Sequence, residues 1–257
     1  LCFHNLFWYN RIAVTGIIFL TMYSGISVTY CMDQNRGIMM WKKLYHKYGH
    51  FLFALVFIAI NLVFDRLEKT IVPRYHMETW LDSYIPFVKV FVIPYLIWFV
   101  YIIAVPAYIG FHSKEDFLKL CTFMAVGQSI CLLAYYLFPN GQNLRPMITD
   151  KDIFSRMILW IYSHDTSTNV APSIHVLHSL AVHIGLMNYQ PFRKKKILPV
   201  LSFVMMVTVV LSTVFIKQHA VMDVFYGLLL SGVLYALIYK YIPWRKAVRT
   251  RDAVLEH

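Results

Sequence analysis

The sequence predicts an all-α, polytopic integral membrane protein. Of its 257 residues, 59% are apolar and only 14% are charged, a composition too apolar for a soluble domain of this length. The apolar residues gather in long runs separated by charged breaks, and a helix needs about 20 mostly apolar residues to cross a bilayer. These observations predict a chain that crosses the membrane several times.

Seven apolar runs are candidates for spanning helices. They lie at about 12–31, 48–65, 88–110, 116–138, 173–188, 197–216 and 220–242. Because Arg11 precedes it, the first run also fits a signal sequence, but its length and the lack of a small-residue cleavage site favour a helix. We expect an extra N-terminal helix with its linker at 1–47, a six-helix membrane domain at 48–242 and a basic tail at 243–257. The tail ends in Leu255–Glu256–His257, which we interpret as the remnant of an expression tag.

The net charge of +11 comes from Lys and Arg in short runs beside the apolar segments. Because these residues form no single basic face, binding to nucleic acid is excluded and a membrane surface is favoured. Positive loops stay in the cytoplasm, which places the run Arg193–Lys196 and the tail there. The loop at 139–172 and the junction at 217–219 then face the extracytoplasmic side of the cell membrane.

The cysteines and histidines do not predict a metal or redox centre. The four cysteines, at 2, 31, 121 and 131, have no C-x-x-C spacing and are expected to pack in or beside apolar runs. His175, His178 and His183 have no carboxylate with them in one helix, so zinc is not expected. We expect His178 to pack near the site or support it.

Two polar clusters on the predicted outer side suit an anion. "FPNGQNLRP" at 138–146 carries Asn143 and Arg145, and the guanidinium offers a planar fork of donors for phosphate, although an arginine here also suits lipid headgroups. In "APSIH", Ser173 precedes a helix whose first amides, at Ile174 and His175, point outward as donors. The alternative is that Ser173 only caps the helix.

A third cluster pairs His219 with Asp223. At i and i+4 they share one helical face, so the carboxylate can orient the imidazole and leave its other nitrogen free to attack or to accept a proton. An acid inside an apolar run is a candidate functional residue. Together the clusters supply phosphate-binding groups and two histidines on one side of the membrane, a set of residues suited to phosphoryl transfer.

These residues resemble the type 2 phosphatidic acid phosphatase superfamily of lipid phosphate phosphatases. Its motifs are Lys-x6-Arg-Pro, Pro-Ser-Gly-His and Ser-Arg-x5-His-x3-Asp, matched here by Arg145–Pro146, by Pro172–His175, and by Ser212 with His219 and Asp223. The resemblance implies a six-helix core over about 48–242, with His219 as nucleophile, Asp223 as its orienting partner and His175 as general acid. Arg145, Ser173 and the Ile174 amide would hold the phosphoryl oxygens, with no metal or cofactor.

The motifs are incomplete. Phe138, Ile174 and Thr213 stand where the family has Lys, Gly and Arg. Lys217 is a candidate to replace the lost charge, or else it anchors a helix end, and Lys151 in the outer loop is a second candidate. In lacking these cations the sequence resembles the inositol phosphorylceramide synthase and sphingomyelin synthase branch, whose members cleave phosphodiester lipids. A phosphodiester carries less charge than a phosphomonoester and needs fewer cations around it.

The expected substrate is therefore a lipid phosphate or phospholipid, cleaved by hydrolysis or by transfer to another alcohol. Two other functions stay open. A transporter would use Asp223 and the histidines to relay protons, and a degenerate family member would bind lipid without turning it over. The oligomeric state is not predicted.

Overall fold

The computed structural model describes residues 44–244, and residues 1–43 and 245–257 lie outside that description. The predicted span at 12–31 and nearly all of the predicted tail therefore fall outside the described residues. The chain divides into two compact units, residues 1–59 and 60–257. The described part of the first unit holds a short 3-10 helix, η1 (Gly49–Phe53), and the beginning of α3 (Ala54–Thr70), which continues into the second unit.

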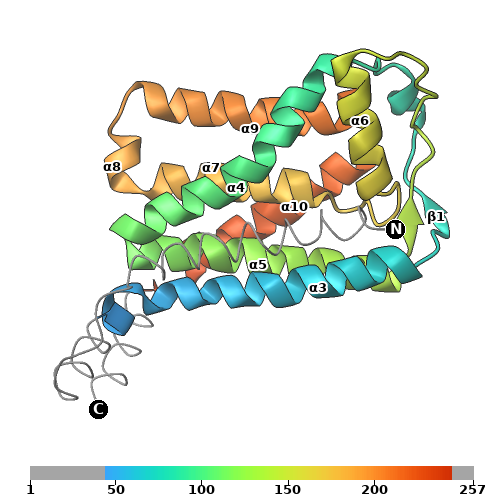
Figure 1. The fold of residues 1–257 in the computed structure, drawn as a ribbon. Coiled ribbons are helices and arrows are strands. Elements are labelled where there is room, and N and C mark those ends of the chain that lie inside the picture. The colour runs from blue at the N-terminus through green and yellow to red at the C-terminus, as the bar shows by residue number, and fades with distance from the viewer. Residues whose placement is uncertain (1–43, 245–257) are drawn as a thin grey trace, which may run out of the picture. The chain divides into compact units, whose positions relative to one another are not determined.

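The second unit is a helical bundle (Figure 1). After α3 come η2 (Trp80–Ser83), η3 (Lys89–Phe91), α4 (Val92–His112), α5 (Lys114–Leu137), α6 (Ile153–His164), α7 (Ile174–Asn188), α8 (Gln190–Arg193), α9 (Ile197–Phe215) and α10 (Val221–Tyr235), which runs into a π-helical turn, η4 (Ala236–Tyr241). Helix α7 packs against α4, α5, α9 and α10. The helix that carries the Pro-Ser-x-His sequence is thus enclosed by other helices.

Five helices in the described part of the chain are long and apolar enough to cross a membrane. They are Leu44–Thr70, Lys89–His112, Lys114–Leu137, Ile197–Phe215 and Val221–Tyr241, and Ile174–Asn188 is a shorter apolar helix. Each coincides with one of the runs predicted after residue 48. The chain is therefore a mostly helical, multi-pass membrane protein, while the count of six spanning helices plus one stays a prediction.

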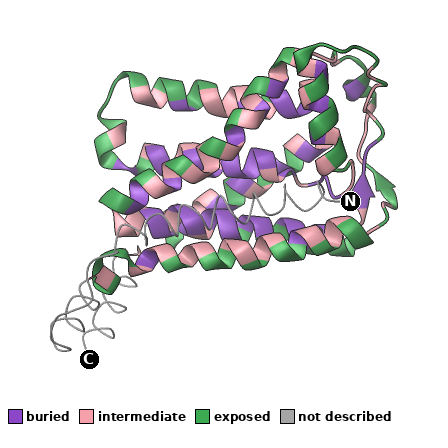
Figure 2. Cartoon of the chain, in the orientation of Figure 1, coloured by how far each residue is buried: buried purple, intermediate pink, exposed green. Residues whose placement is uncertain are grey.

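Burial differs between the helices as a membrane environment requires (Figure 2). In α5, 61% of the apolar stretch is buried, against 28% in α9. The large apolar side chains of α9 that remain exposed include Ile197, Val200, Leu201, Phe203 and Val204. Apolar surface of this extent suits contact with lipid tails rather than water.

Glycines allow α7 to approach its neighbours closely. A Cβ added to Gly127 of α5 would lie 2.6 Å from a Leu177 methyl carbon, and one added to Gly227 of α10 would lie 3.0 Å from Val176 Cβ and 3.2 Å from the Ser173 carbonyl oxygen. Small residues of this kind let helix backbones pack tightly in membranes. Gly227 thereby sets the distance between α10 and the start of α7.

The loops that the sequence places on the outer side meet at one end of the second unit. A short parallel pair, β1 (Tyr75–His76) and β2 (Asn140–Gly141), joins two of them. The Val88 amide donates to the Phe215 carbonyl at 3.0 Å, which ties the third junction to the same end. The loop expected at 139–172 is in part a helix, α6, which begins at Ile153. Asp152 caps this helix, and its carboxylate accepts the Ser155 amide at 3.0 Å.

Candidate active site

Two hydrogen bonds made by Ser173, the capping residue of α7, hold the first turn of this helix in place. The Ser173 hydroxyl accepts the Val176 amide at 3.4 Å, and the Ser173 amide donates to the Asp223 carbonyl at 3.1 Å. The helix therefore begins directly beside the first turn of α10. His175 lies one residue into that turn, and its position is set relative to Asp223 by backbone hydrogen bonds.

A tight turn between α9 and α10 presents His219. The amides of Gln218 and His219 both donate to the Thr213 carbonyl, at 2.9 and 3.0 Å, and Lys217 adopts a left-handed backbone with φ of 54°. Thr213 stands where the family motif has Arg, and its carbonyl has a structural part in the turn. The turn delivers His219 to the first turn of α7.

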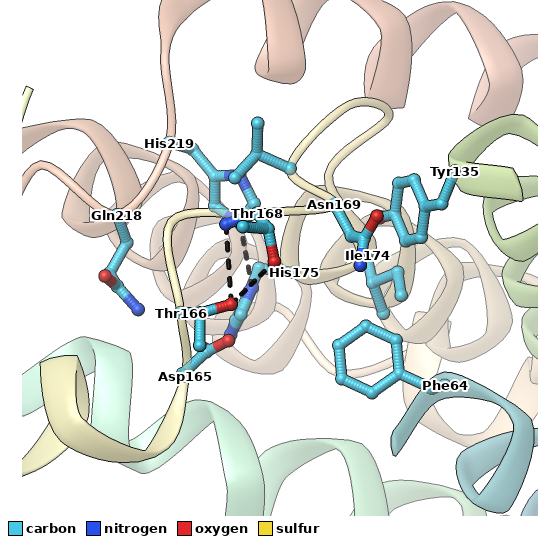
Figure 3. Close-up of a pocket in the computed structure, with 11 residues that line it drawn as sticks. Phe64, Tyr135, Asp165, Thr166, Thr168, Asn169, Ile174, His175, Gln218 and His219 are labelled. Carbon is cyan, nitrogen blue, oxygen red and sulfur yellow. Dashed lines mark hydrogen bonds between the residues drawn. The ribbon is translucent and has the colours of Figure 1, made fainter. Parts of the chain in front are cut away.

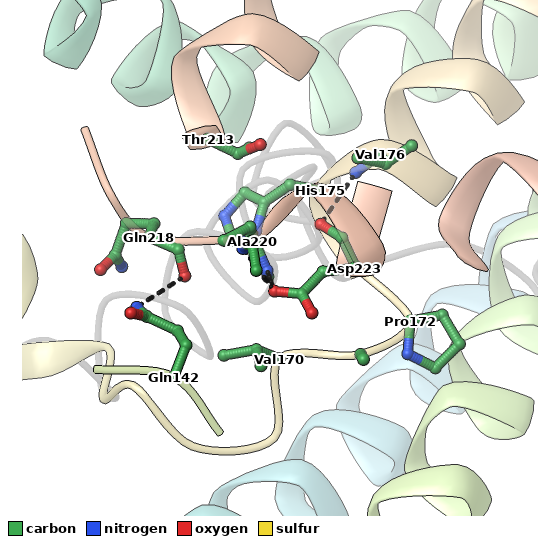
Figure 4. A network of polar contacts seen from close by, with 12 residues as sticks. Gln142, Val170, Pro172, His175, Val176, Thr213, Gln218, Ala220 and Asp223 are labelled. Carbon is green, nitrogen blue, oxygen red and sulfur yellow. Dashed lines mark hydrogen bonds and ion pairs between the residues drawn. The ribbon is translucent and has the colours of Figure 1, made fainter. Parts of the chain in front are cut away.

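Three catalytic candidates form one hydrogen-bonded chain. Figure 4 shows His175 and Asp223 in the surrounding network of polar contacts. Asp223, which is fully buried, accepts the Ala220 amide at 2.8 Å through Oδ2, and the same oxygen lies 3.2 Å from His219 Nδ1. His219 Nε2 lies 3.1 Å from His175 Nδ1. If the carboxylate holds the proton on His219 Nδ1, then Nε2 carries the lone pair and His175 Nδ1–H is the donor of the bond between the rings.

Aromatic rings enclose His175. Its ring centroid lies 4.1 Å from that of Trp98 and 4.6 Å from that of Tyr95, and Phe99 packs edge-on at 6.4 Å. All three aromatic residues belong to α4. They fix the plane of the imidazole and keep bulk water from that side of the ring.

A small pocket opens onto the two histidines (Figure 3). Its volume is about 30 Å³, which is room for about two water molecules. It is lined by Phe64, Tyr135, Asp165, Thr166, Thr168, Asn169, Val170, Ile174, His175, Gln218 and His219. Among these lining residues there is one carboxylate and there is no lysine or arginine.

Arg145 lies behind the pocket wall, where it is held by the protein. Its guanidinium donates to the carbonyls of Tyr162 and Asp165 at 3.2 and 2.6 Å and to Gln218 Oε1 at 2.5 Å, and it stacks 4.3 Å from the Tyr162 ring centroid. Burial lowers the pKa of the guanidinium. In this form Arg145 joins the end of α6 to the residue before His219, and its binding to phosphate stays a prediction.

Lys217 points away from the histidines. Its ammonium donates to the carbonyls of Asp82 and Ile85 at 2.9 and 2.6 Å, and burial lowers its pKa. Asp82 in turn accepts the Val221 amide at 2.8 Å, where a carboxylate favours the positive end of α10. The observed contacts correspond to the alternative that Lys217 anchors the end of a helix.

Asn143 is exposed, and its amide lies 3.2 Å from His76 Nδ1 rather than at the pocket. The neighbouring Gln142 is buried and donates to the Lys217 carbonyl at 2.9 Å. Gln142 therefore supports the turn that presents His219. The roles of Asn143, Ser173 and Ile174 in phosphate binding stay predictions, although Ile174 does line the pocket.

The sequence did not predict Gln142, Tyr95, Trp98, Asn169 or Gln218, and for Asp165 it favoured a solvated loop over a place at the entrance. Tyr95 links two of the others, since its hydroxyl donates to Asp165 at 2.8 Å and lies 3.3 Å from the Gln218 amide. The polar stretches "NGQN" and "HDTSTN" were visible signals. They gave no indication of which side chains point inward.

A family model for the PAP2 superfamily matches residues 116–247, just over half of the chain. The chain belongs to the PAP2 superfamily. The matched region runs from α5 through α10 and contains Arg145, Ser173, His175, His219 and Asp223. No match appears among curated proteins or among solved structures. Membership indicates phosphatase or phosphotransferase activity on phosphate esters, in a membrane protein.

Proposed function

We propose that this protein transfers a phosphoryl group from a lipid ester to water or to another alcohol, through a phosphohistidine on His219. The observation that carries the proposal is the chain Asp223–His219–His175, with nitrogen-to-oxygen and nitrogen-to-nitrogen distances of 3.2 and 3.1 Å. A buried carboxylate on one ring nitrogen directs the lone pair of the other nitrogen toward the pocket. A second imidazole lies within proton-transfer distance of that nitrogen.

In the first step His219 Nε2 attacks phosphorus, and an N–P bond forms as the P–O bond to the lipid alcohol breaks. His175 enters this step as an imidazolium, gives its Nδ1 proton to the leaving oxygen and becomes neutral, so the alcohol departs neutral. The Asp223 carboxylate stabilises the positive charge that develops on the His219 ring. These roles need no group beyond the substrate and the three side chains.

In the second step water or an acceptor alcohol attacks phosphorus, and His175 takes its proton as general base. The P–N bond breaks and its electron pair returns to His219 Nε2. Hydrolysis releases phosphate or a phosphomonoester, whereas transfer yields a new phosphate ester. The same two histidines therefore serve both reactions, and the acceptor decides the product.

The substrate must separate the two imidazoles. The His175–His219 bond leaves 3.1 Å between the nitrogens, and a phosphorus atom with its leaving oxygen does not fit into that distance. Reacting atoms in a productive complex lie about 3–3.5 Å apart, so phosphorus belongs beside His219 and the leaving oxygen beside His175. The observed bond is a resting contact that holds both rings in place until substrate enters.

A phosphodiester substrate is the second candidate, as in the inositol phosphorylceramide synthase and sphingomyelin synthase branch. It is supported by the lining of the pocket, where Asp165 is the one ionisable group besides the histidines and Tyr135. A phosphomonoester dianion needs more positive charge around it than a diester monoanion. The charge distribution supports cleavage of a phospholipid with transfer of its headgroup.

The proposal places the reaction at the extracytoplasmic face of the cell membrane. Its support is the excess of Lys and Arg in the loops predicted to be cytoplasmic, above all Arg193–Lys196. A site that meets lipid at the outer leaflet suits the exposed apolar surface of the bundle.

The test uses the purified full chain in mixed micelles with lipid phosphomonoesters, pyrophosphates and phosphodiesters, with and without diacylglycerol or ceramide as acceptor. Mass spectrometry of the products separates hydrolysis from transfer. Rapid alkaline quenching should trap an acid-labile, base-stable phosphoenzyme that His219→Ala abolishes. The exposed His112, at the far end of α4, gives the control His112→Ala. Full turnover by His219→Ala would exclude the mechanism.

A further inference from the structure

Asn169 lies in the wall of the active-site pocket and takes no part in the proposed chemistry. Its side chain is buried, with 4% of the residue exposed, and it lines the pocket together with His175 and His219 (Figure 3). Its backbone is left-handed, with φ of 56°, a conformation that asparagine tolerates better than most residues. An uncommon backbone at a pocket wall is a reason to examine what the side chain does.

The conformation of Asn169 is imposed by its surroundings. Its amide donates to the Asn140 carbonyl at 2.7 Å, and the side-chain oxygen of Asn140 accepts the amides of Val170 and Ala171, each at 2.9 Å. The Tyr135 hydroxyl holds the next carbonyl, that of Pro172, at 2.7 Å. The side chain of Asn169 is therefore aimed at the pocket by a clamped backbone.

Within the described part of the chain, neither Nδ2 nor Oδ1 of Asn169 has a hydrogen-bond partner. Leaving a buried polar group without a partner costs about 1–3 kcal/mol, and here both ends of one amide are left so. A ligand in the pocket would satisfy them. Because the amide offers one donor group and one acceptor, the ligand must both accept and donate.

The neighbouring side chains present acceptors. Thr166 donates its only hydroxyl hydrogen to Glu68 Oε1 at 3.0 Å, so Thr168 is the donor in the 2.7 Å bond between the two threonine hydroxyls. The Thr168 hydroxyl oxygen is therefore left with lone pairs that can accept a hydrogen bond. The Asp165 carboxylate is also an acceptor, and one of its oxygens accepts the Tyr95 hydroxyl. Asp165, Thr168 and Asn169 Oδ1 together need hydrogen-bond donors. Ionised phosphate oxygens only accept, so a phosphate group alone does not match this wall.

We propose that this wall, formed by Asp165, Thr168 and Asn169, selects esters whose alcohol part carries a hydroxyl next to the phosphate, and that Asn169 is the residue that reads it. Its Nδ2 donates to a phosphoryl or hydroxyl oxygen, and its Oδ1 accepts the hydroxyl hydrogen. The proposal rests on the proposed function and adds the substrate class. The hydroxyl belongs either to the lipid alcohol of a phosphomonoester or to the headgroup of a phosphodiester.

Two substrate pairs test it on the purified full chain. The monoester pair is 1-acylglycerol 3-phosphate against 1-acylpropane-1,3-diol 3-phosphate, and the diester pair is phosphatidylglycerol against phosphatidylpropanol. In at least one pair we expect kcat/KM to be higher by about 10-fold or more for the hydroxyl member, because a site built to bond a hydroxyl rejects the analogue that lacks it. The pair that shows the preference tells which source supplies the hydroxyl.

In Asn169→Gly the ratio of kcat/KM for the hydroxyl member to that for its deoxy analogue should fall to about 1, while glycine keeps the left-handed backbone. Asn169→Asp, which keeps the shape and the acceptor, should retain part of the preference. The exposed Asn188→Ala, in the last turn of α7, is the matched control and should keep the full ratio.

A wild-type ratio below about 2-fold in both pairs, or a ratio unchanged in Asn169→Gly, would overturn the proposal, and so would faster turnover of phosphatidylethanolamine than of phosphatidylglycerol, because an ammonium group would then be the preferred donor. Turnover of the deoxy members reports the proposed function by itself. If those are cleaved and the ratio is absent, only the role of Asn169 fails. If none of the esters is cleaved, the proposed function fails with it.

Discussion

Asp223 is the residue on which the orientation of His219 depends. Its Oδ2 accepts from the Ala220 amide and lies 3.2 Å from His219 Nδ1. In Asp223→Asn the amide nitrogen can donate to Nδ1 and favour the tautomer that carries its proton on Nε2, which is useless as a nucleophile. We expect kcat to fall about 100- to 10,000-fold with a smaller change in KM, measured by steady-state release of product.

A buried serine on the same helix provides the control for Asp223→Asn. Ser231 is fully buried and donates within α10 to the Gly227 carbonyl at 2.7 Å, far from the histidines in sequence. Ser231→Ala should keep activity within about 3-fold, since it removes one local hydrogen bond. Equal losses in both variants would mean that Asp223 acts through folding rather than through His219.

Lys217 distinguishes a phosphate ligand from a structural anchor. Its ammonium donates to the carbonyls of Asp82 and Ile85. As an anchor, Lys217→Met should lower the melting temperature and reduce kcat similarly for monoesters and diesters, because it loosens the turn before His219. A loss of more than about 10-fold in kcat/KM that is confined to dianionic monoesters would instead assign Lys217 to phosphate.

Residue types and spacing predict the three catalytic candidates but only part of their surroundings. His219 and Asp223 are recognisable from their i, i+4 spacing, although His219 lies in the turn before α10 and not on a shared helical face. Ser173–His175 are recognisable because they begin an apolar helix. Asn169 and Gln142 were not predicted, since their inward direction follows from contacts with Asn140 and the 217–218 turn, distant in sequence. Nor does spacing show where Arg145 and Lys217 direct their donors.

At the scale of the helices, the approach of α10 to α7 sets the distance between the histidines. A Cβ on Gly227 would lie 3.0 Å from the β-branched carbon of Val176 and 3.2 Å from the Ser173 carbonyl oxygen. We expect Gly227→Ala to push the first turns apart, lower kcat by about 10-fold or more because sub-ångström placement matters to catalysis, and lower the melting temperature.

Gly232 is the matched control on the same helix. A Cβ there meets nothing within 4 Å, so Gly232→Ala should leave kcat unchanged and stabilise the helix by up to about 1 kcal/mol. Thermal unfolding and turnover of both variants, measured in one detergent, check the pair. Unchanged kcat in Gly227→Ala would show that α7 and α10 adjust without cost.

Hydropathy reliably locates the helices that contact lipid, because a run of about 20 apolar residues is typical of a membrane-spanning helix. It fails where a helix serves another purpose. Helix α6, at Ile153–His164, has 12 residues and lies in a segment expected as a loop. It is too short to span a bilayer, and its apolar face packs under η3 and α4. The Asp152–Ser155 capping pair was the local signal for its start.

For the whole molecule, the segments that form the site meet at one end of the second unit. Tyr75 pairs with Asn140 in the short sheet, the Val88 amide donates to the Phe215 carbonyl, and the Lys217 ammonium donates to the Asp82 carbonyl. The sequence assigns these segments to one side because basic runs mark the opposite connections. Their meeting is what the assignment requires, since a site can form only from loops on the same side. Which side is extracytoplasmic is a separate prediction.

Labelling of single cysteines in intact cells tests which end of the bundle faces the extracytoplasmic side. The native Cys2 and Cys31 are replaced by serine, and Cys121 and Cys131 are buried within the helices. Cysteine is then introduced at the exposed Lys151, before α6, or at the exposed Lys195, between α8 and α9. A membrane-impermeant maleimide should label Lys151→Cys at once.

Lys195→Cys should react only after the membrane is permeabilised, because a run of four basic residues is held in the cytoplasm. Labelling in the reverse order would place the histidines at the cytoplasmic face and leave their chemistry untouched, since no step of the phosphoryl transfer depends on the side. The substrate supply would then change from outer-leaflet to inner-leaflet lipid. Equal labelling at both positions in detergent confirms that each cysteine is accessible, so that a difference between cells and detergent reports the membrane alone.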